Sequence, residues 1–244
     1  MVRKLTSRRV STIPIKFFDL EGLNGKRFSP FGWRVRMALA HKGLEHNSIL
    51  EGVGFTQKYK LEFSGQKLVP VIQDGDIIIS DSWDIAVYLE KSYKSDMPLF
   101  GQNNDFIQAK FISSWVDSQI HPLIAKCVVL DILNVINPDE HEYFRLSREK
   151  RFGASLEQVV SDRDATKKLI QQVLYPIRKA LEVGPFFGGE NPNFSDYALF
   201  GAFMWARMTS SFELLETYDP VESWRERMLS LYDGLAKNAS KTDI

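Results

Sequence analysis

Two short polar motifs stand just before predicted helices and carry groups that could act on an anion. Ser29-Pro30 precedes an amphipathic run over residues 33–41, and Asp81-Ser82 precedes a run that reaches Leu89. Serine and aspartate are favoured N-cap residues, and proline is favoured at the first helical position. A helix start also presents free N–H groups that bind anions. Spacing alone therefore predicts helix caps, with anion binding at the same two positions as the functional alternative.

The other reactive side chains form no recognisable metal or disulfide set. The histidines His41, His46, His121 and His141 lack ligand spacing, so the sequence predicts no metal site. Cys127 is the single cysteine, which excludes an intrachain disulfide and favours a reducing, cytoplasmic location. We predict a small buried side chain there rather than a redox thiol.

The composition is that of an ordinary globular protein. The 244 residues are 44% hydrophobic and 25% charged, and 31 basic residues balance 31 acidic ones. A chain of zero net charge is not expected to bind nucleic acid by neutralising phosphates. The longest mostly apolar stretch, 199–206, is far shorter than the roughly 18 residues of a membrane span. We therefore predict no nucleic-acid partner and no membrane span, and the length allows one large or two small domains.

The first part of the chain alternates strand and helix patterns. Residues 13–20 form an apolar and aromatic run that predicts a strand. The helix after Ser29 and a weak strand near residues 47–50 would complete a βαβ unit. Two β-branched runs then meet at Asp74-Gly75, a pair typical of hairpins, and the helix after Asp81 follows. The predicted order is βαβ then ββα, in a domain that spans residues 13–94.

Helical patterns dominate after a linker predicted at residues 95–104. A long run of helical spacing follows, which Pro122 is expected to kink or interrupt. Asn193 and Asp196 are spaced to cap the next apolar run reciprocally. We therefore predict an all-helical domain over residues 105–244, which is long enough to bury its own core.

A basic extension, residues 1–12, precedes the first strand. It contains four basic side chains and no acidic one. This composition has some likeness to an organelle transit peptide, but the segment is short for one. We predict a solvated extension, because chain ends are often loosely tied down.

These features together resemble the soluble glutathione transferases. The shared features are the βαβ and ββα order, the proline in Val69-Pro70-Val71, the Asp81-Ser82 pair and the all-helical second half. The likeness covers nearly the whole chain from Ile15. Three segments look like the bacterial β-etherases and their fungal etherase-related counterparts: Phe28-Ser29-Pro30-Phe31-Gly32-Trp33-Arg34-Val35-Arg36, Ser80-Asp81-Ser82-Trp83, and residues 148–157. The resemblance implies a thioredoxin-like α/β domain followed by an all-α domain.

The resemblance implies a catalytic role for Ser29, which occupies the strand-to-helix turn where the family carries its catalytic hydroxyl or thiol. A free thiol has a pKa of about 8.5, so only a few per cent of it is thiolate at neutral pH. A hydroxyl that donates to the sulfur, with the N–H groups of a helix start, favours the anion. Ser29 is thus implied to be a hydrogen-bond donor, and the sulfur of glutathione, the co-substrate, is the nucleophile.

Five further residues match glutathione-binding positions of the family. Val69 and Pro70 fit its cis-proline turn, which leaves the Val69 backbone to pair with the tripeptide, although sequence statistics alone favour a trans proline. Asp81 is implied to face the γ-glutamyl ammonium, and Ser82 with the helix N–H groups to take its carboxylate. Lys67 would neutralise the glycyl carboxylate, but it is one place removed from the usual spacing, and a solvated lysine is the alternative.

The acceptor pocket is expected where the two domains meet, since large apolar pockets form at such junctions. We predict that Trp115, His121 and Trp224 line it, and that most other aromatic residues at helical spacing are core. Arg34 and Arg36 are predicted to form a solvated helix face or an interface pair.

The expected activity is attack of the glutathione thiolate on hydrophobic aromatic electrophiles, including cleavage of a β-aryl ether beside a ketone. One alternative is a binding protein of the same fold that sequesters hydrophobic phenolic ligands with little turnover. Another is a thiol reductase, which would need cysteine where Ser29 stands. The resemblance also implies a homodimer, in which a second chain would help to cover the small first domain.

Overall fold

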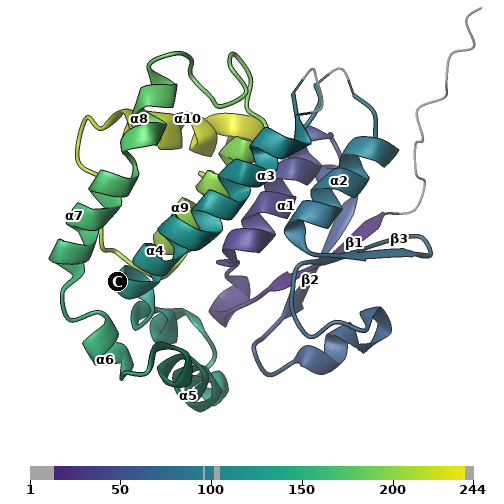
Figure 1. The fold of residues 1–244 in the computed structure, drawn as a ribbon. Coiled ribbons are helices and arrows are strands. Elements are labelled where there is room, and N and C mark those ends of the chain that lie inside the picture. The colour runs from purple at the N-terminus through teal and green to yellow at the C-terminus, as the bar shows by residue number, and fades with distance from the viewer. Residues whose placement is uncertain (1–13, 96, 102–104, 240–244) are drawn as a thin grey trace, which may run out of the picture.

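The computed structural model describes residues 14–95, 97–101 and 105–239 (Figure 1). Within these residues a single sheet has the strands β1 (Ile15–Leu20), β2 (Ser48–Val53), β3 (Val71–Asp74) and β4 (Ile77–Ser80). Its order is β2-β1-β3-β4, with β1 parallel to β2, and with β3 antiparallel to β1 and to β4. The predicted βαβ and ββα order is therefore confirmed.

The described residues form ten α-helices, most of them after the sheet. They are α1 (Pro30–His41), α2 (Ser82–Ser92), α3 (Phe106–Trp115), α4 (His121–Val128), α5 (His141–Phe152), α6 (Leu156–Val159), α7 (Arg163–Val173), α8 (Tyr175–Leu181), α9 (Phe194–Thr209) and α10 (Pro220–Gly234). Beyond residue 105 the described chain contains no strand, only an isolated bridge between Phe186 and Gly189. The α/β and all-α fold class predicted from the sequence is confirmed.

Local sequence explains the elements of the first half. In β1 the side chains of Ile15, Phe17 and Asp19 are buried while their neighbours are more exposed, as expected for a strand with one face on the core. The hairpin turns immediately after Asp74, where Gly75 has a φ of 60°, a conformation that glycine adopts without steric cost. Two helices, α1 and α2, pack against each other beside this sheet (Figure 1).

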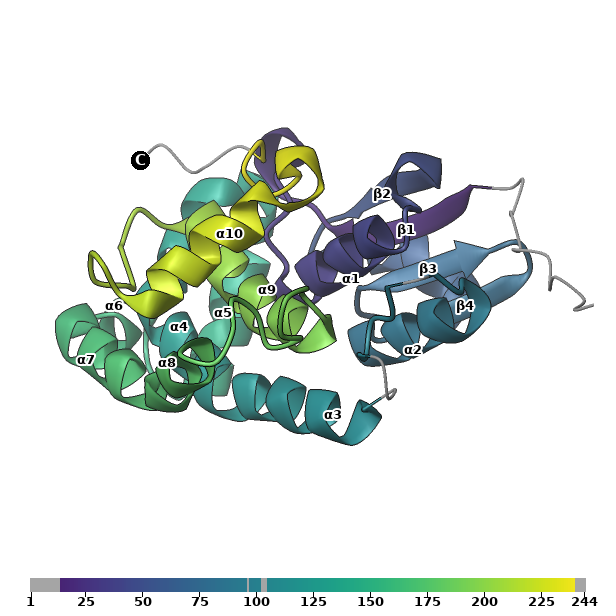
Figure 2. The same ribbon diagram turned by 90° about the horizontal axis from the view of Figure 1, so that it is seen from above.

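Helix α9 is the central element of the second half. All of its residues except Trp205 and Arg207 are buried, and the predicted capping box of Asn193 and Asp196 forms at its start. It packs against α1 at the junction of the sheet and the helices (Figure 2). At Gly201 the two helices are so close that a Cβ atom would lie 2.3 Å from the carbonyl oxygen of Pro30.

The interruption expected at Pro122 occurs just before that residue. Residues Val116–Ile120 form a π-helical turn between α3 and α4, and Pro122 occupies the first turn of α4. A proline is tolerated there because the first N–H groups of a helix have no intrahelical partner. The wider π-helical turn rotates α4 relative to α3, so side chains at regular helical spacing across the turn no longer share one face.

Two sequence predictions fall wholly or partly outside the described residues. The basic extension 1–12 lies outside them, and so does part of the linker at 95–104. None of the helices in the described part of the chain is both long enough and apolar enough to cross a bilayer.

Candidate functional site

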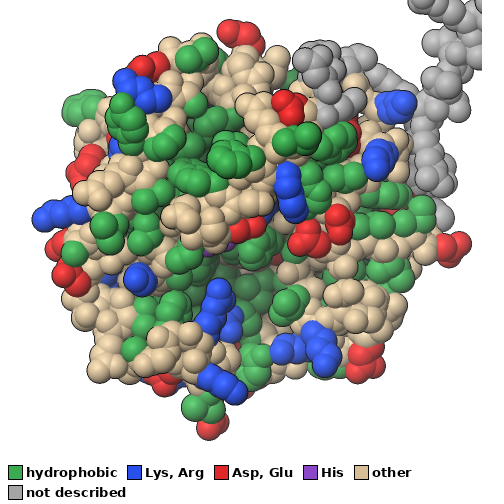
Figure 3. Space-filling model, viewed as in Figure 1, with side chains coloured by type: hydrophobic (Ala, Val, Ile, Leu, Met, Phe, Trp, Pro, Cys, Tyr) green, Lys and Arg blue, Asp and Glu red, His purple; other side chains and the backbone are tan. Residues whose placement is uncertain are grey.

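A cavity of about 630 Å³ lies between the sheet half and the helical half of the chain. Figure 3 shows a hollow on this face, with hydrophobic side chains at its floor and basic side chains at its edge. Its walls come from the turn before α1, the loop after β2, the segment before β3, and helices α4, α5 and α9. The cavity is therefore built where the two halves meet, as the sequence predicted.

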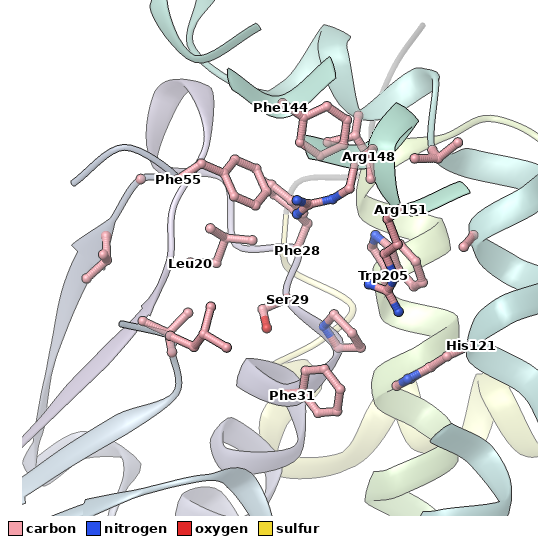
Figure 4. Close-up of a pocket in the computed structure, with 18 of the residues that line it drawn as sticks. Leu20, Phe28, Ser29, Phe31, Phe55, His121, Phe144, Arg148, Arg151 and Trp205 are labelled. Atoms are coloured by element: carbon pink, nitrogen blue, oxygen red, sulfur yellow. The ribbon is translucent and has the colours of Figure 1, made fainter. Parts of the chain in front are cut away.

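Ser29 lies in this cavity at the N-cap of α1 (Figure 4). The side chain is buried, and its Oγ accepts a hydrogen bond from the N–H of Gly32 at 3.1 Å. A hydroxyl has one proton and two lone pairs, and no described residue accepts the proton of Ser29. The residue can thus cap the helix and still donate to a group in the cavity.

The turn that carries Ser29 is held by buried contacts on both sides. The indole N–H of Trp33 donates to the carbonyl of Arg27 at 3.0 Å. Gly32 faces Asp19, and a Cβ atom at Gly32 would lie 1.9 Å from its Oδ1, so only glycine fits there. Burial raises the pKa of Asp19 to about 6, although Arg36 and Arg27 oppose the shift.

The five residues matched to glutathione binding form a second group beside Ser29. Lys67 and Val69 line the same cavity, whereas Pro70, Asp81 and Ser82 do not. Even so, the backbone N–H of Asp81 donates to the carbonyl of Pro70 at 3.3 Å, which joins the group. The Val69–Pro70 peptide bond is cis.

Asp81 and Ser82 differ in exposure although they are adjacent. The exposed carboxylate of Asp81 caps α2, accepting from the N–H groups of Trp83 at 2.8 Å and Asp84 at 3.4 Å. The side chain of Ser82 is 3% exposed. The predicted capping role of Asp81 is thus present.

Of the three residues predicted for the acceptor pocket, only His121 lines the cavity. Trp224 is fully buried in the helical core, where its indole N–H donates to Asp196 at 2.9 Å. Trp115 lies before the π-helical turn and lines a separate hollow beside α8. Trp115 and Trp224 therefore do not line this cavity, and helical spacing could not show this because it does not reveal which neighbour a helix faces.

His121 presents a neutral ring to the cavity. Burial, with a smaller contribution from Arg34, lowers its pKa to about 3. Its Nδ1 lies 3.4 Å from a carboxylate oxygen of Asp117, and its buried Nε2 has no hydrogen-bond partner among the described residues. The ring stands edge-on to Phe31 and Trp205. The imidazole is therefore uncharged at neutral pH, and its Nε2 is a buried nitrogen without a hydrogen-bond partner among the described residues.

Of the two alternatives predicted for Arg34, the solvated face is wrong, and an ion pair between the two halves of the chain is present. Arg34 is 1% exposed, and its guanidinium pairs with Asp117 at 2.6 Å and donates to Ser113 at 3.3 Å. Because Asp117 also faces His121, one carboxylate links α1 to the pocket wall. Arg36 is partly buried and stacks over the ring of Trp33.

Most of the cavity wall was not predicted. Besides aliphatic side chains, the missed residues include aromatic and basic ones, among them Phe28, Phe31, Phe55, Phe144, Trp205, Arg148 and Arg151. The phenylalanines beside Ser29 were visible as part of a motif, and the three-residue spacing of the two arginines places them on one helix face. The sequence alone does not show that these faces meet across a cavity.

The described residues contain no group of three or more histidine, cysteine, aspartate or glutamate side chains that could hold a metal ion. Cys127 is buried, and burial raises the pKa of its thiol to about 11. A thiol with so high a pKa is a poor nucleophile near neutral pH. The chemistry of this site therefore depends on the cavity described above.

Family models of two protein domains match the chain. The glutathione S-transferase N-terminal domain matches residues 28–92, and the glutathione S-transferase C-terminal domain matches residues 107–232. Among curated proteins, a zeta-class glutathione S-transferase of Euphorbia esula is 34% identical over 120 residues. That alignment covers 46% of this chain and 51% of the relative, so the chain spans only about half of that protein.

Solved structures align over more of the chain. Glutathione transferase GSTFuA3 of Phanerochaete chrysosporium has a TM-score of 0.73 and 25% identity, covering 91% of this chain and 92% of its own. A glutathione S-transferase of Ceriporiopsis subvermispora, solved with glutathione, has a TM-score of 0.74 and 23% identity, covering 95% and 100%. The second likeness supports the fold alone.

Proposed function

The chain belongs to the glutathione S-transferase family. We therefore propose that it joins glutathione, through its sulfur, to a hydrophobic aromatic acceptor. In this proposal Ser29 activates the thiol of glutathione. The observation that carries the proposal is the hydroxyl of Ser29, which lies in the cavity with its proton available. Activation is needed because a thiol with a pKa of about 8.5 is mostly protonated at neutral pH.

Two features at Ser29 favour the thiolate over the thiol. The hydroxyl can donate a charge-assisted hydrogen bond to the sulfur, and the N-terminus of α1 adds a positive partial charge. Each pKa unit by which the thiol is lowered corresponds to about 1.4 kcal/mol of differential stabilisation. A charge-assisted hydrogen bond and a helix N-terminus each stabilise an anion by about 1 kcal/mol or more, which is enough to lower the pKa of the thiol by about one unit.

The tripeptide is proposed to lie along the segment before β3 and the start of α2. The backbone of Val69 would pair with it as an added strand does, Asp81 would face its ammonium, and Ser82 its γ-glutamyl carboxylate. Lys67, which lines the cavity, would neutralise the glycyl carboxylate. This placement follows the family resemblance, and the hydrogen bond from Asp81 to Pro70 is consistent with it.

The acceptor is proposed to be aromatic, since aromatic rings from both halves of the chain surround Ser29. In the finer form of the proposal it is a β-aryl ether beside a ketone. The thiolate attacks the carbon next to the carbonyl, a C–S bond forms, the C–O bond breaks, and the aryl group leaves as phenolate. Holding sulfur and carbon side by side supplies much of the rate gain.

A turnover screen tests the proposal. The chain is incubated with glutathione and with aryl ether ketones, halogenated nitroaromatics or peroxides, and products are identified by mass spectrometry. Glutathione-dependent product from an aromatic electrophile is the expected result. Quenching of tryptophan fluorescence by phenolic ligands without any product would instead show a binding protein, since Trp205 lines the cavity.

Replacing Asp81 tests the binding of the tripeptide. In Asp81→Ala, glutathione affinity measured by calorimetry is expected to fall about tenfold or more, because the ammonium loses a charged partner. The free energy of unfolding is expected to fall by about 1 kcal/mol through the lost cap.

Asp81→Asn is the matched variant. Asparagine can accept the same N–H groups and tolerates the φ of 74° found here, so the helix start is preserved while the charge is removed. Unchanged glutathione affinity in this variant would mean that Asp81 acts only as a cap.

We also expect a homodimer, for which α3 offers an apolar surface. Ile107 and Phe111 lie four residues apart on one face of this helix and are 86% and 66% exposed. Light scattering at micromolar concentration is expected to give twice the 28.0 kDa mass of one chain. Phe111→Glu is expected to shift the mass to one chain, and Leu169→Glu, on an exposed part of α7, is the control. A single-chain mass for the unmodified protein at all concentrations would contradict the dimer.

A further inference from the structure

Two arginines of α5 point into the cavity from the side opposite the sheet. Arg148 and Arg151 both line the wall, and Figure 4 shows Arg148 extending toward Phe55 and Phe28, with Arg151 beside Trp205. A spacing of three residues places them on the same face of α5. Nothing in the proposed activation of glutathione uses them.

Arg148 lies beside a pair of packed aromatic rings, and no acidic partner for it occurs among the described residues. Its guanidinium carbon lies 5.1 Å from the ring centroid of Phe55 and 4.7 Å from that of Phe144. Its Nη1 donates to the hydroxyl of Ser147 at 2.9 Å. Burial, and then repulsion from Arg151, lower its pKa. Two rings therefore contact a cation that forms no ion pair with a described carboxylate.

Arg145, on the same helix, shows the opposite arrangement. It pairs with Glu149 at 3.0 Å and with Glu157 at 2.9 Å, at the protein surface. Glu149 and Glu157 are thus paired with an arginine that does not line the cavity. The two inward arginines are left for a ligand.

The wall of the cavity is positively charged as a whole. Its basic side chains are those of Lys58, Lys67, Arg148 and Arg151, and its single carboxylate among the described residues is Asp117. That carboxylate is already paired with the buried Arg34. An anion would therefore enter a site that has an excess of cations, of which Arg148 is half-buried and Arg151 is exposed.

We propose that Arg148 and Arg151 form an anion subsite of the acceptor pocket, and that the acceptors of this protein are aromatic acids. The inference rests on the proposed function, because it assumes that the acceptor occupies this cavity. The aromatic ring of such an acid would contact the phenylalanines, and its carboxylate would accept hydrogen bonds from the guanidinium groups. Guanidinium suits this role because its planar fork matches a carboxylate.

A matched pair of acceptors tests the subsite. A chlorodinitrobenzoate and the corresponding chlorodinitrobenzamide undergo the same reaction, in which the thiolate forms a C–S bond and chloride leaves, but only the benzoate is an anion. The unmodified protein is expected to prefer the benzoate by about tenfold or more in kcat/KM, the value of one charge-assisted hydrogen bond. In Arg148→Gln and in Arg151→Gln this preference is expected to fall to about parity.

Lys150→Gln is the control, because it removes the same charge from the same helix at an exposed position outside the cavity. It should leave the preference unchanged. Arg148→Gln loses two ring contacts, so thermal unfolding is used to check that it remains folded. If Arg148→Gln is unfolded, Arg151→Gln alone tests the subsite.

Three results would overturn the subsite. The first is equal turnover of the two acceptors by the unmodified protein. The second is a preference for the benzoate that persists in both arginine variants. The third is a KM for glutathione that is raised in the arginine variants with both acceptors. The last result would assign the arginines to the tripeptide. If neither acceptor reacts, the turnover screen above decides the proposed function, and calorimetry with dinitrobenzoate and dinitrobenzamide decides whether Arg148 and Arg151 bind the anion.

Discussion

Ser29→Ala is expected to lower kcat/KM at neutral pH by roughly ten- to a hundredfold while leaving glutathione affinity largely intact. That range corresponds to losing a hydrogen bond to a charged group, about 1.5–3 kcal/mol. The loss falls on the ionised sulfur, so the pKa of the bound thiol rises back toward its free value of about 8.5. The activity profile should shift to higher pH, and the deficit should shrink as pH rises.

The control must separate catalysis from capping, because Ser29 also accepts the N–H of Gly32. Ser155→Ala removes a comparable cap, since the Oγ of Ser155 accepts the N–H of Gln158 at 3.2 Å and lies outside the cavity. Both variants should lose about 1 kcal/mol of stability, but only the first should lose activity. Unchanged turnover at neutral pH in folded Ser29→Ala would remove this hydroxyl from the mechanism.

Gly201→Ala is expected to lower the free energy of unfolding by about 1–3 kcal/mol, as overpacking of a core does. The added Cβ would lie 2.3 Å from the carbonyl oxygen of Pro30 and 3.3 Å from Arg34. Alanine is the better helix former by about 1 kcal/mol, so any net loss shows that the clash outweighs propensity. Because Pro30 directly follows Ser29, the shift that relieves the clash should also lower turnover.

Urea unfolding of the unmodified chain, Gly201→Ala and Gly184→Ala measures this effect. Gly184 is a suitable control, since the nearest atoms to its added Cβ lie at 3.5 Å, an ordinary contact. Equal or greater stability in Gly201→Ala would mean that α1 and α9 can move apart at little cost.

Local sequence was sufficient to predict the starts of elements. The N-cap at Ser29, the hairpin at Asp74-Gly75 and the capping box of Asn193 with Asp196 all form as predicted. Each depends on interactions within a few residues, such as a side-chain oxygen accepting a nearby N–H. Sequence spacing is enough to identify contacts of that range.

The surroundings of the candidate site depend on contacts that spacing does not encode. Arg34 was expected on a solvated face or in an interface pair, and spacing could not name its partner, Asp117, which is 83 residues away in the chain. Trp224 was expected in the pocket, but its polar N–H finds a buried carboxylate in the core. In both cases a partner distant in sequence determines where the side chain lies, and α5 brings its arginines to the cavity for the same reason.

The ion pair between Arg34 and Asp117 limits how the protein can admit its ligands. A hinge motion that separated α1 from the helical wall would leave the buried guanidinium of Arg34 without its counter-ion. Such a state is costly, since a buried charge needs a partner. The ion pair therefore opposes a hinge opening on this side of the cavity. The distance between α1 and the π-helical turn is expected to stay the same with and without a bound ligand.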